Sequence, residues 1–408
     1  MPSSNAPTSA PGSAARAHAT GIRRHAVVLG LLTAIGPFAI DMYLPALPAI
    51  GRSLGAAPDA VQASLMAFFL ALGAGQLVVG PLSDMLGRRG PMLVGLTLFI
   101  AASIGCALAP NVDVLIALRF VQGLGACACM VTPRAIVRDL YTGPDAAHLM
   151  SLGLTVYSVS PIVAPLFGSF VADVAGWRSV FGAIAVLAMA GVATVVWLLP
   201  ETRPVAARLQ SSFRGAMAGY GVLLRDRQFL TVACMASLAL STFFVYVANS
   251  SFVMSTHYGV SPRSYALLFA LNAVALVVVS QWNGRLVARF GLRRLLRMAV
   301  TAQALVMVAL LALTLAGVDR LDVMVALLVI GYGCNGVIVP AAFVLGMEKH
   351  PALAGTASAL IGTFNFVGGA VMVALVSPFA NGTPLPMLAG IAACAVGAFA
   401  FGRFGLAR

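Results

Sequence analysis

Charge-free apolar segments recur along this chain from end to end, and each is long enough to cross a lipid bilayer as a helix, which takes about 20 residues. The chain is 60% hydrophobic and only 9% charged, against about 25% charged in a typical soluble domain. We therefore expect an all-α integral membrane protein. We predict twelve spans, with approximate cores at residues 26–50, 60–82, 91–110, 114–133, 149–172, 179–199, 228–253, 264–283, 298–317, 323–346, 355–377 and 385–402.

The net charge of +13 follows the connections between these spans. Of the 25 Lys and Arg residues, 20 lie in the N-terminal tail, in alternate loops and at the C-terminus. Four fall on the other side, and Arg119 lies within a span. Because cytoplasmic loops carry an excess of positive charge, both termini are predicted to be cytoplasmic. The charge is thus explained by topology, and we expect no nucleic-acid partner.

The chain contains an internal repeat. The segment "GPLSDMLGRRG" begins at Gly80 and "GRLVARFGLRR" begins at Gly284, an offset of 204 residues. This predicts two six-helix halves, a plan that transporters use with a substrate site near the midplane between the halves. We expect a disordered cytoplasmic tail at 1–25, the halves at 26–200 and 228–402, a cytoplasmic linker at 201–227, and a cytoplasmic C-terminus at 403–408.

These features resemble the major facilitator superfamily over essentially the whole chain from about residue 22. "DMYLPALP", "RFVQGLGA" and "PRAIVRDLY" resemble its drug:proton antiporters of the bicyclomycin and chloramphenicol resistance (Bcr/CflA) type. The resemblance implies a multidrug efflux transporter of the bacterial inner membrane that is driven by the proton gradient, has no cofactor and acts as a monomer. The superfamily signature G-x-L-x-D-x-x-G-R-R is met at Gly80, Leu82, Asp84, Gly87, Arg88 and Arg89.

In this family the acid of the signature, here Asp84, helps to hold the cytoplasmic gate closed. We expect its partners to be Arg134 or Arg138 and the start of the helix near Ala354, because the N-terminus of a helix favours negative charge. The second copy of the repeat has Ala288 at the matching position, so we expect asymmetric gating. For the arginines of the signature, simple anchoring at the membrane surface is the alternative.

The fifth span resembles the antiporter motif of the family at Ala164, Pro165 and Gly168, although three of the four motif glycines are replaced. Small residues let helices approach closely, and proline provides a bend. The same residues also fit ordinary helix packing.

Asp41 is the one carboxylate in the run 26–51, and Arg119 lies in the fourth span. Arg52 and Asp113 are expected near the outer membrane surface. From the helical rise, Asp41 lies ~16 Å from Arg52 and Arg119 lies ~9 Å from Asp113, so both are in the outer half of the membrane. Burial favours a neutral carboxyl and a nearby guanidinium favours an ionised one, so Asp41 is the candidate proton carrier, tuned by Arg119. A fixed structural pair, or an Arg119 that reaches the outer surface, are the alternatives. Pro45 and Pro48 are expected to break the outer end of the first helix.

Other polar residues in spans are predicted to line the substrate cavity, with interhelical hydrogen bonds as the alternative role. The phosphate-binding motif Gly-x-x-x-x-Gly-Lys-Ser/Thr is excluded, because the only lysine, Lys349, is followed by His350. No His-Glu-x-x-His segment occurs either, so we expect neither an ATP-driven pump nor a metal site nor an enzyme. The predicted cavity residues are Tyr43, Gln122, Tyr157, Tyr246, Asn249, Asn272 and Asn365.

The sequence therefore favours proton-coupled export of small amphipathic toxic compounds. Export of a specific metabolite, such as a sugar, amino acid or peptide, is the second hypothesis. A dedicated polar site for such a metabolite usually needs convergent charges, and only Asp41 and Arg119 are evident. A membrane sensor or scaffold without transport is the third, and it lacks any soluble signalling domain.

Overall fold

The computed structural model describes residues 11–141 and 143–405, and in that part of the chain every regular element is helical. Eleven of its helices are long and apolar enough to cross a membrane. A shorter apolar helical segment, Val159–Ala175, lies where the fifth span was expected. The prediction of an all-α membrane fold is confirmed.

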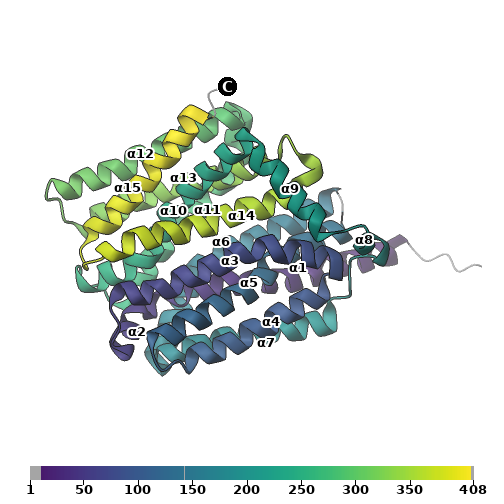
Figure 1. Ribbon diagram of the computed structural model, residues 1–408, viewed down its shortest axis with the longest axis horizontal. Coiled ribbons are helices and arrows are strands. Elements are labelled where there is room, and N and C mark those ends of the chain that lie inside the picture. Colours follow the sequence, from purple (N-terminus) through teal and green to yellow (C-terminus); the bar gives the residue numbers. More distant parts are fainter. Residues whose placement is uncertain (1–10, 142, 406–408) are drawn as a thin grey trace, which may run out of the picture.

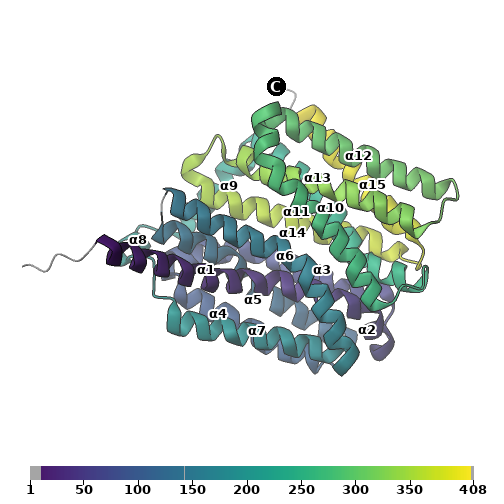
Figure 2. The same cartoon turned by 180° about the vertical axis from the view of Figure 1, so that it is seen from behind.

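Two groups of helices lie side by side, and each is drawn in its own range of colours (Figure 1). The groups meet where α3 packs against α14 and where α6 packs against α11. The view from behind shows the same division (Figure 2). The first group holds α1 (Pro11–Asp41), α2 (Leu47–Leu54), α3 (Pro58–Leu86), α4 (Arg89–Ala107), α5 (Val112–Leu140), α6 (Gly143–Ala175) and α7 (Trp177–Leu198). The second holds α10 (Arg227–Thr256), α11 (Pro262–Phe290), α12 (Leu292–Leu315), α13 (Leu321–Met347), α14 (Ala354–Val376) and α15 (Pro384–Ala400).

The segment between the groups, predicted as a linker, contains two short helices, α8 (Val205–Leu209) and α9 (Phe213–Arg225). α9 packs against α3 of the first group and against α10 and α14 of the second. The Tyr220 hydroxyl donates a hydrogen bond to the Leu77 carbonyl of α3 at 3.3 Å. The linker is therefore a folded bridge between the groups.

The first helix differs from its prediction at one end and agrees at the other. α1 begins at Pro11, so residues 11–25, expected to be disordered, are helical. At its other end α1 stops at Asp41, and a 3₁₀ turn, Leu44–Ala46, leads into α2. This interruption confirms the predicted break, and its cause is that Pro45 and Pro48 have no backbone N–H to continue the helical hydrogen bonds.

The two copies of the repeat make the same turn. Gly87 follows α3 with a φ of 95°, and Gly291 follows α11 with a φ of 76°. Residues with a side chain rarely adopt these angles, so both positions favour glycine. The offset found in the sequence thus corresponds to matching positions in the two groups.

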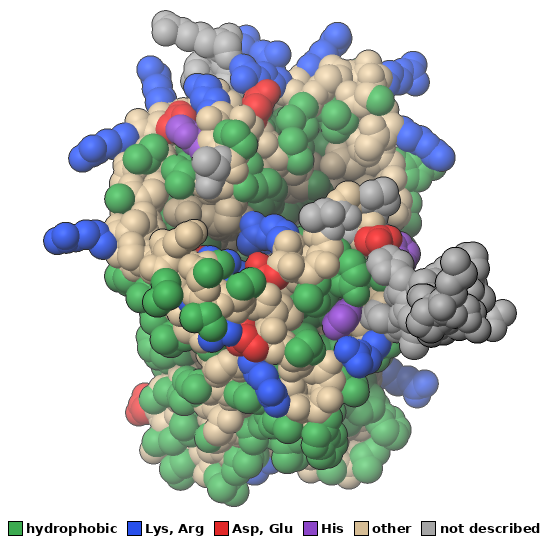
Figure 3. Space-filling view, turned by 90° about the vertical axis from the view of Figure 1, so that its right-hand side faces the viewer, with side chains coloured by type: hydrophobic (Ala, Val, Ile, Leu, Met, Phe, Trp, Pro, Cys, Tyr) green, Lys and Arg blue, Asp and Glu red, His purple; other side chains and the backbone are tan. Residues whose placement is uncertain are grey.

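The two ends of the molecule differ. Arginine side chains surround the face nearest α8, and this face is hollowed between the groups (Figure 3). At the opposite end, beside α2, Gln62 of α3 bridges the groups. Its Nε2 donates to Asn249 Oδ1 at 3.2 Å, and its Oε1 accepts from Ser377 Oγ at 2.8 Å. The groups are therefore hydrogen-bonded to each other at the α2 end.

Candidate proton-coupling site and gate

Asp41 occupies the C-terminal end of α1, at the point where the helix breaks. Its side chain is 3% exposed, and it is the only buried acidic residue in the described part of the chain. Within that same part, its carboxylate has no hydrogen-bond or ion-pair partner. A helix C-terminus and an apolar setting both oppose a negative charge. This setting makes Asp41 the candidate proton-binding residue.

Arg119 is fully buried and is held by groups other than Asp41. Its Nη1 donates to the Ala39 carbonyl at 3.1 Å and to Gln122 Oε1 at 2.6 Å. Its guanidinium carbon lies 4.6 Å from the centre of the Tyr43 ring and 4.3 Å from that of Phe68, a favourable cation–π arrangement. Arg119 therefore binds the C-terminal end of α1, where helix carbonyls lack helical partners and a cation is favoured.

This arrangement agrees with neither of the two alternatives for Arg119. It does not reach the outer surface, because it is fully buried. It forms no ion pair with Asp41, although both residues are described, so the fixed structural pair is also wrong. The predicted similarity in depth is confirmed, since Arg119 bonds the carbonyl of a residue two positions before Asp41.

The antiporter-like motif of α6 meets α1 at the same break. A Cβ atom on Gly168 would lie 2.7 Å from Met42 Cα, and closer still to the Met42 carbonyl oxygen. Ala164 and Pro165, one turn earlier, are buried. Only a residue without a side chain lets α6 approach the backbone beside Asp41, and the sequence did not indicate this contact.

Several predicted cavity residues form interhelical hydrogen bonds, the alternative role. Tyr43 bonds Ser64 at 2.8 Å, and Gln122 donates to Ser103 at 2.7 Å. Tyr246 accepts from Asn272 Nδ2 at 3.0 Å, and Asn249 accepts from Gln62 as described above. The Tyr157 side chain lies outside the described residues.

Two predicted cavity residues keep a buried acceptor without a partner in the described part of the chain. These atoms are Asn272 Oδ1 on α11 and Asn365 Oδ1 on α14. Aromatic rings lie on the same helices and on α3 and α10: the Phe69 ring centre is 4.6 Å from that of Phe244 and 6.2 Å from that of Phe366. Where the groups meet, Phe69 of the first group thus packs against rings of the second group, which also carries both amide acceptors.

The gate motif forms a charge cluster on the arginine-rich face, but with different partners from those expected. Asp84 pairs with Arg88 at 2.7 Å and with Arg203 at 3.5 Å. Arg88 also pairs with Asp139 at 2.6 Å. Pairing of Asp84 with Arg134 or Arg138 was therefore wrong in this conformation. Asp84 belongs to the end of α3 and finds its partners within the first group and the linker.

The other residues of that prediction occupy separate places. The Arg138 guanidinium lies beside Gly355 at the start of α14, 3.5 Å from where a Cβ atom of Gly355 would be. The residue that contacts the start of α14 is thus Arg138, not Asp84. Arg134 is exposed, and a side chain at Gly80 would meet nothing within 4 Å.

Glu201, just after α7, organises the turn of the motif. Its carboxylate accepts the backbone N–H groups of Arg88 at 2.8 Å, Arg89 at 3.1 Å and Arg203 at 3.0 Å. A Cβ atom on Gly87 would lie 2.8 Å from the Glu201 carboxyl carbon, so a side chain there would displace this carboxylate from the turn. Burial opposes ionisation, but these N–H groups and Arg208 lower the pKa of Glu201 overall.

We predict that Glu201→Gln destabilises the protein at neutral pH and that the difference from wild type disappears in acid. Because the fold lowers the pKa of Glu201, its stabilisation is present above the ordinary pKa and is lost as the pH falls through the lowered one. Thermal unfolding of the purified protein at neutral pH and at about pH 3 measures this effect.

Glu348→Gln is the control, since the Glu348 carboxylate is exposed and pairs with Arg293 at 3.5 Å. Such surface pairs contribute little, so this variant should unfold like wild type at both pH values. A Glu201→Gln defect of equal size at both pH values contradicts the role of the charge.

Sequence reasoning missed Asp139, Glu201 and Arg203 as parts of the cluster. Asp139 lies in "PRAIVRDLY", and Glu201 and Arg203 follow the sixth span in "PETRP". An acid directly after an apolar span, close to arginines, was the available signal.

Comparison with known proteins agrees with this fold. The model of a family described as the Major Facilitator Superfamily matches residues 29–373. The chain belongs to this superfamily. Its helical groups, its signature turn at Gly87 and its relatives all fit that membership, which indicates a membrane transporter rather than an enzyme.

Three bacterial relatives match this chain over most of its length. An uncharacterized MFS-type transporter, YdgK, of Bacillus subtilis is 37% identical and covers 94% of this chain and 95% of its own. A bicyclomycin resistance protein homolog of Haemophilus influenzae is 31% identical, with 91% and 93% covered. Multidrug resistance protein D of Escherichia coli is 30% identical, with 86% and 87% covered. The resemblance to the Bcr/CflA type is confirmed.

Solved structures of distant members share the fold. A D-xylose-proton symporter superposes with a TM-score of 0.72 at 16% identity, covering 94% of this chain and 97% of its own. A POT family transporter bound to 5-aminolevulinic acid gives a TM-score of 0.74 at 12% identity, with 93% and 94% covered. At such identity the likeness concerns the fold alone.

Proposed function

We propose that this transporter exports small amphipathic toxic compounds in exchange for protons that bind at Asp41. The observation that carries the proposal is the position of Asp41: it is the only buried acid of the described chain, it stands at a helix break, and it has no fixed partner among the described residues. The names of the relatives, which include resistance proteins for bicyclomycin, chloramphenicol and several drugs, support the drug as the other substrate.

The break after Asp41 provides a way to couple the proton to a movement of the two groups. The 3₁₀ turn Leu44–Ala46 packs against α10 and α11 of the second group, and Asp41 is within electrostatic range of Tyr265 on α11. When the groups rock apart at this end, the surroundings of the carboxyl group change from protein to water. Opening therefore lets the carboxyl group exchange protons with water on that side, and closure isolates it from that side again.

The walls between the groups suggest the chemistry of the exported compound. The rings of Phe69, Phe244 and Phe366 offer apolar and stacking contacts. The amide oxygens of Asn272 and Asn365, which have no partner among the described residues, can accept hydrogen bonds from a substrate. We infer a substrate with an apolar ring system and one or two N–H or O–H donors. Because no charged pair converges there, this favours varied amphipathic compounds over a dedicated polar metabolite.

The proposal places the protein in the bacterial inner membrane with both termini cytoplasmic. The positive-inside distribution and the bacterial relatives support this placement. No cofactor is needed, since the proton gradient drives the exchange. The site lies within one chain, which supports a functional monomer.

Drug resistance in cells that lack their own efflux pumps tests the function. Cells that express the protein should tolerate higher concentrations of aromatic, donor-bearing antibiotics than cells with an empty plasmid. An ionophore that collapses the proton gradient should return accumulation of a fluorescent drug to the level of the empty plasmid. Export that survives this collapse would contradict proton coupling, and no gain of tolerance to any compound of this class would contradict drug export.

A further inference from the structure

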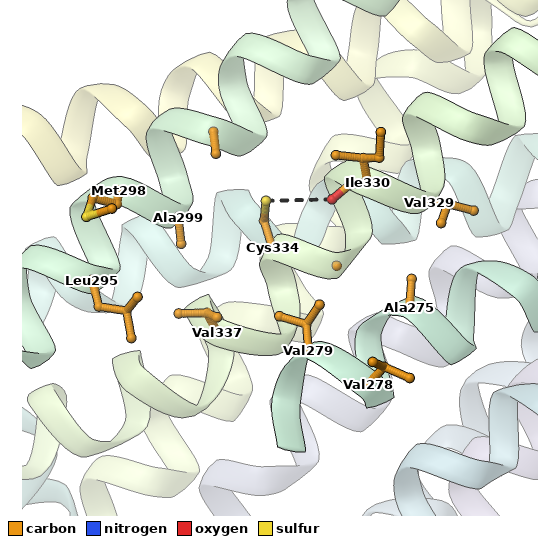
Figure 4. Close-up of a pocket in the computed structure, with 12 residues that line it drawn as sticks. Ala275, Val278, Val279, Leu295, Met298, Ala299, Val329, Ile330, Cys334 and Val337 are labelled. Atoms are coloured by element: carbon orange, nitrogen blue, oxygen red, sulfur yellow. Dashed lines mark hydrogen bonds between the residues drawn. The ribbon is translucent and has the colours of Figure 1, made fainter. Parts of the chain in front are cut away.

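A groove of about 570 Å³ opens among α11, α12 and α13 of the second group (Figure 4). This volume falls within the ~300–1,000 Å³ of ligand pockets. The side chains around it are apolar, and the Cys334 thiol bonds within its own helix, to the Ile330 carbonyl at 3.7 Å. The lining residues are Ala275, Val278 and Val279 of α11, Leu295, Met298, Ala299 and Ala302 of α12, and Val329, Ile330, Gly333, Cys334 and Val337 of α13.

The shape of the groove follows from how the three helices pack. α13 packs closely against both α11 and α12, while α11 and α12 touch each other much less, so α13 forms the floor. Val278, Met298 and Ile330 remain 46–55% exposed along the walls. In a bilayer this side of the molecule faces the hydrocarbon core, so an acyl chain is the molecule that reaches the groove most readily.

One end of the groove carries positive charge. Leu295 lies only three residues after α12 begins, near the turn at Gly291. Residues three or four apart share one face of a helix. Trp282 and Arg285 therefore continue the stripe of Val278 along α11, and Arg294 continues that of Met298 along α12.

These three side chains are exposed, and by this spacing they lie beyond the lined part of the groove, toward the turn at Gly291. Neither Arg285 nor Arg294 has an ion-pair partner among the described residues. Tryptophan is enriched at the boundary between hydrocarbon and headgroups, which fits the depth of Trp282. Long arginine side chains near helix ends extend toward that boundary.

We propose that this groove binds one anionic phospholipid, with an acyl chain along α13 and its phosphate beside Arg285 and Arg294. The two arginines select an anionic headgroup and disfavour a cationic amphipathic drug. A lipid site of this kind is independent of which compound the transporter exports. Each arginine beside the headgroup is expected to increase the enrichment of anionic lipid in the groove about fivefold.

Tryptophan quenching by brominated lipid tests the site in the full-length protein. The chain has three tryptophans, and Trp177→Phe with Trp197→Phe leaves Trp282 as the only reporter. The protein is reconstituted in phosphatidylcholine vesicles that hold a small, equal fraction of brominated phosphatidylglycerol or brominated phosphatidylcholine. We expect several-fold stronger quenching of Trp282 by the anionic lipid.

Arg285→Gln with Arg294→Gln should reduce this preference to parity, and lysine at both positions should retain it. Arg214→Gln with Arg225→Gln, which removes the same charge from α9, should leave it unchanged. Ala302→Phe, which fills the groove, should weaken it while both arginines remain. A second reporter that keeps only Trp197, exposed at the end of α7, should be insensitive to the Arg285 and Arg294 changes. Equal quenching of Trp282 by both lipids, or a preference that survives the double Gln variant, overturns the proposal.

Discussion

Replacing Asp41 by asparagine is expected to abolish proton movement coupled to drug transport while the protein still accumulates in the membrane. Asparagine has nearly the same size and resembles the neutral carboxyl group that the buried helix end favours. It cannot release a proton, so the exchange loses its ion. In inverted vesicles, drug-dependent proton release should fall to the level of vesicles without the protein. Energy-independent exchange of drug across the membrane should persist, because the residues proposed to contact the drug are unchanged.

Two further variants show whether the loss concerns this carboxyl group. Asp41→Glu keeps a titratable group and should retain part of the proton release. Asp113→Asn changes an exposed acid in the first turn of α5 and should leave the release intact. If the Asp41→Asn vesicles still release protons when drug is added, Asp41 is not the carrier. If that variant does not accumulate in the membrane while Asp41→Glu does, the carboxyl group has a structural role instead.

Gly168→Ala is expected to impair both folding and transport, although it adds a single methyl group. The new Cβ would overlap the backbone of Met42, which cannot rotate away as a flexible side chain would. Overpacking of this kind costs about 1–3 kcal/mol, and relief would require α6 to move away from the break beside Asp41. We expect a lower melting temperature in detergent and a transport rate reduced about tenfold or more, since the contact lies next to the proposed proton site.

Gly153→Ala is the matched control on the same helix, because a Cβ there meets no described atom within 4 Å. In an open position of a helix, alanine is favoured over glycine by about 0.5–1 kcal/mol, so this variant should be as stable as wild type or more so. Equal behaviour of the two variants would mean that the close approach of α6 to Met42 has no consequence.

The gate illustrates where prediction from sequence fails. The signature predicted that Asp84 takes part in a charge cluster near Arg88, and it does. Its further partner is Arg203 of the linker, not Arg134 or Arg138 of the fourth span. The choice depends on which helix ends lie side by side and on where the linker runs. Neither is encoded in local spacing.

Arg119 gives a second example. Its depth and its cost in a membrane followed from the sequence, and the candidate partner was the nearest acid. The structure supplies a main-chain carbonyl at Ala39, a side-chain amide at Gln122 and two aromatic faces. A backbone carbonyl becomes an acceptor only because the helix breaks after it, so the partner could not be read from residue types.

The sequence by itself determined the membrane class, the helical spans, the repeat and the one carboxylate that stands in an apolar run. These depend on local composition, because a helix in lipid must satisfy its own backbone and exclude charge over about 20 residues. Only the tertiary structure decided that Gly168 must lie against Met42, that Glu201 holds the turn at Gly87, and that Asp41 has no fixed partner among the described residues. Each of these depends on atoms more than 100 residues apart, or on a space that several helices leave between them, and packing alone sets such contacts.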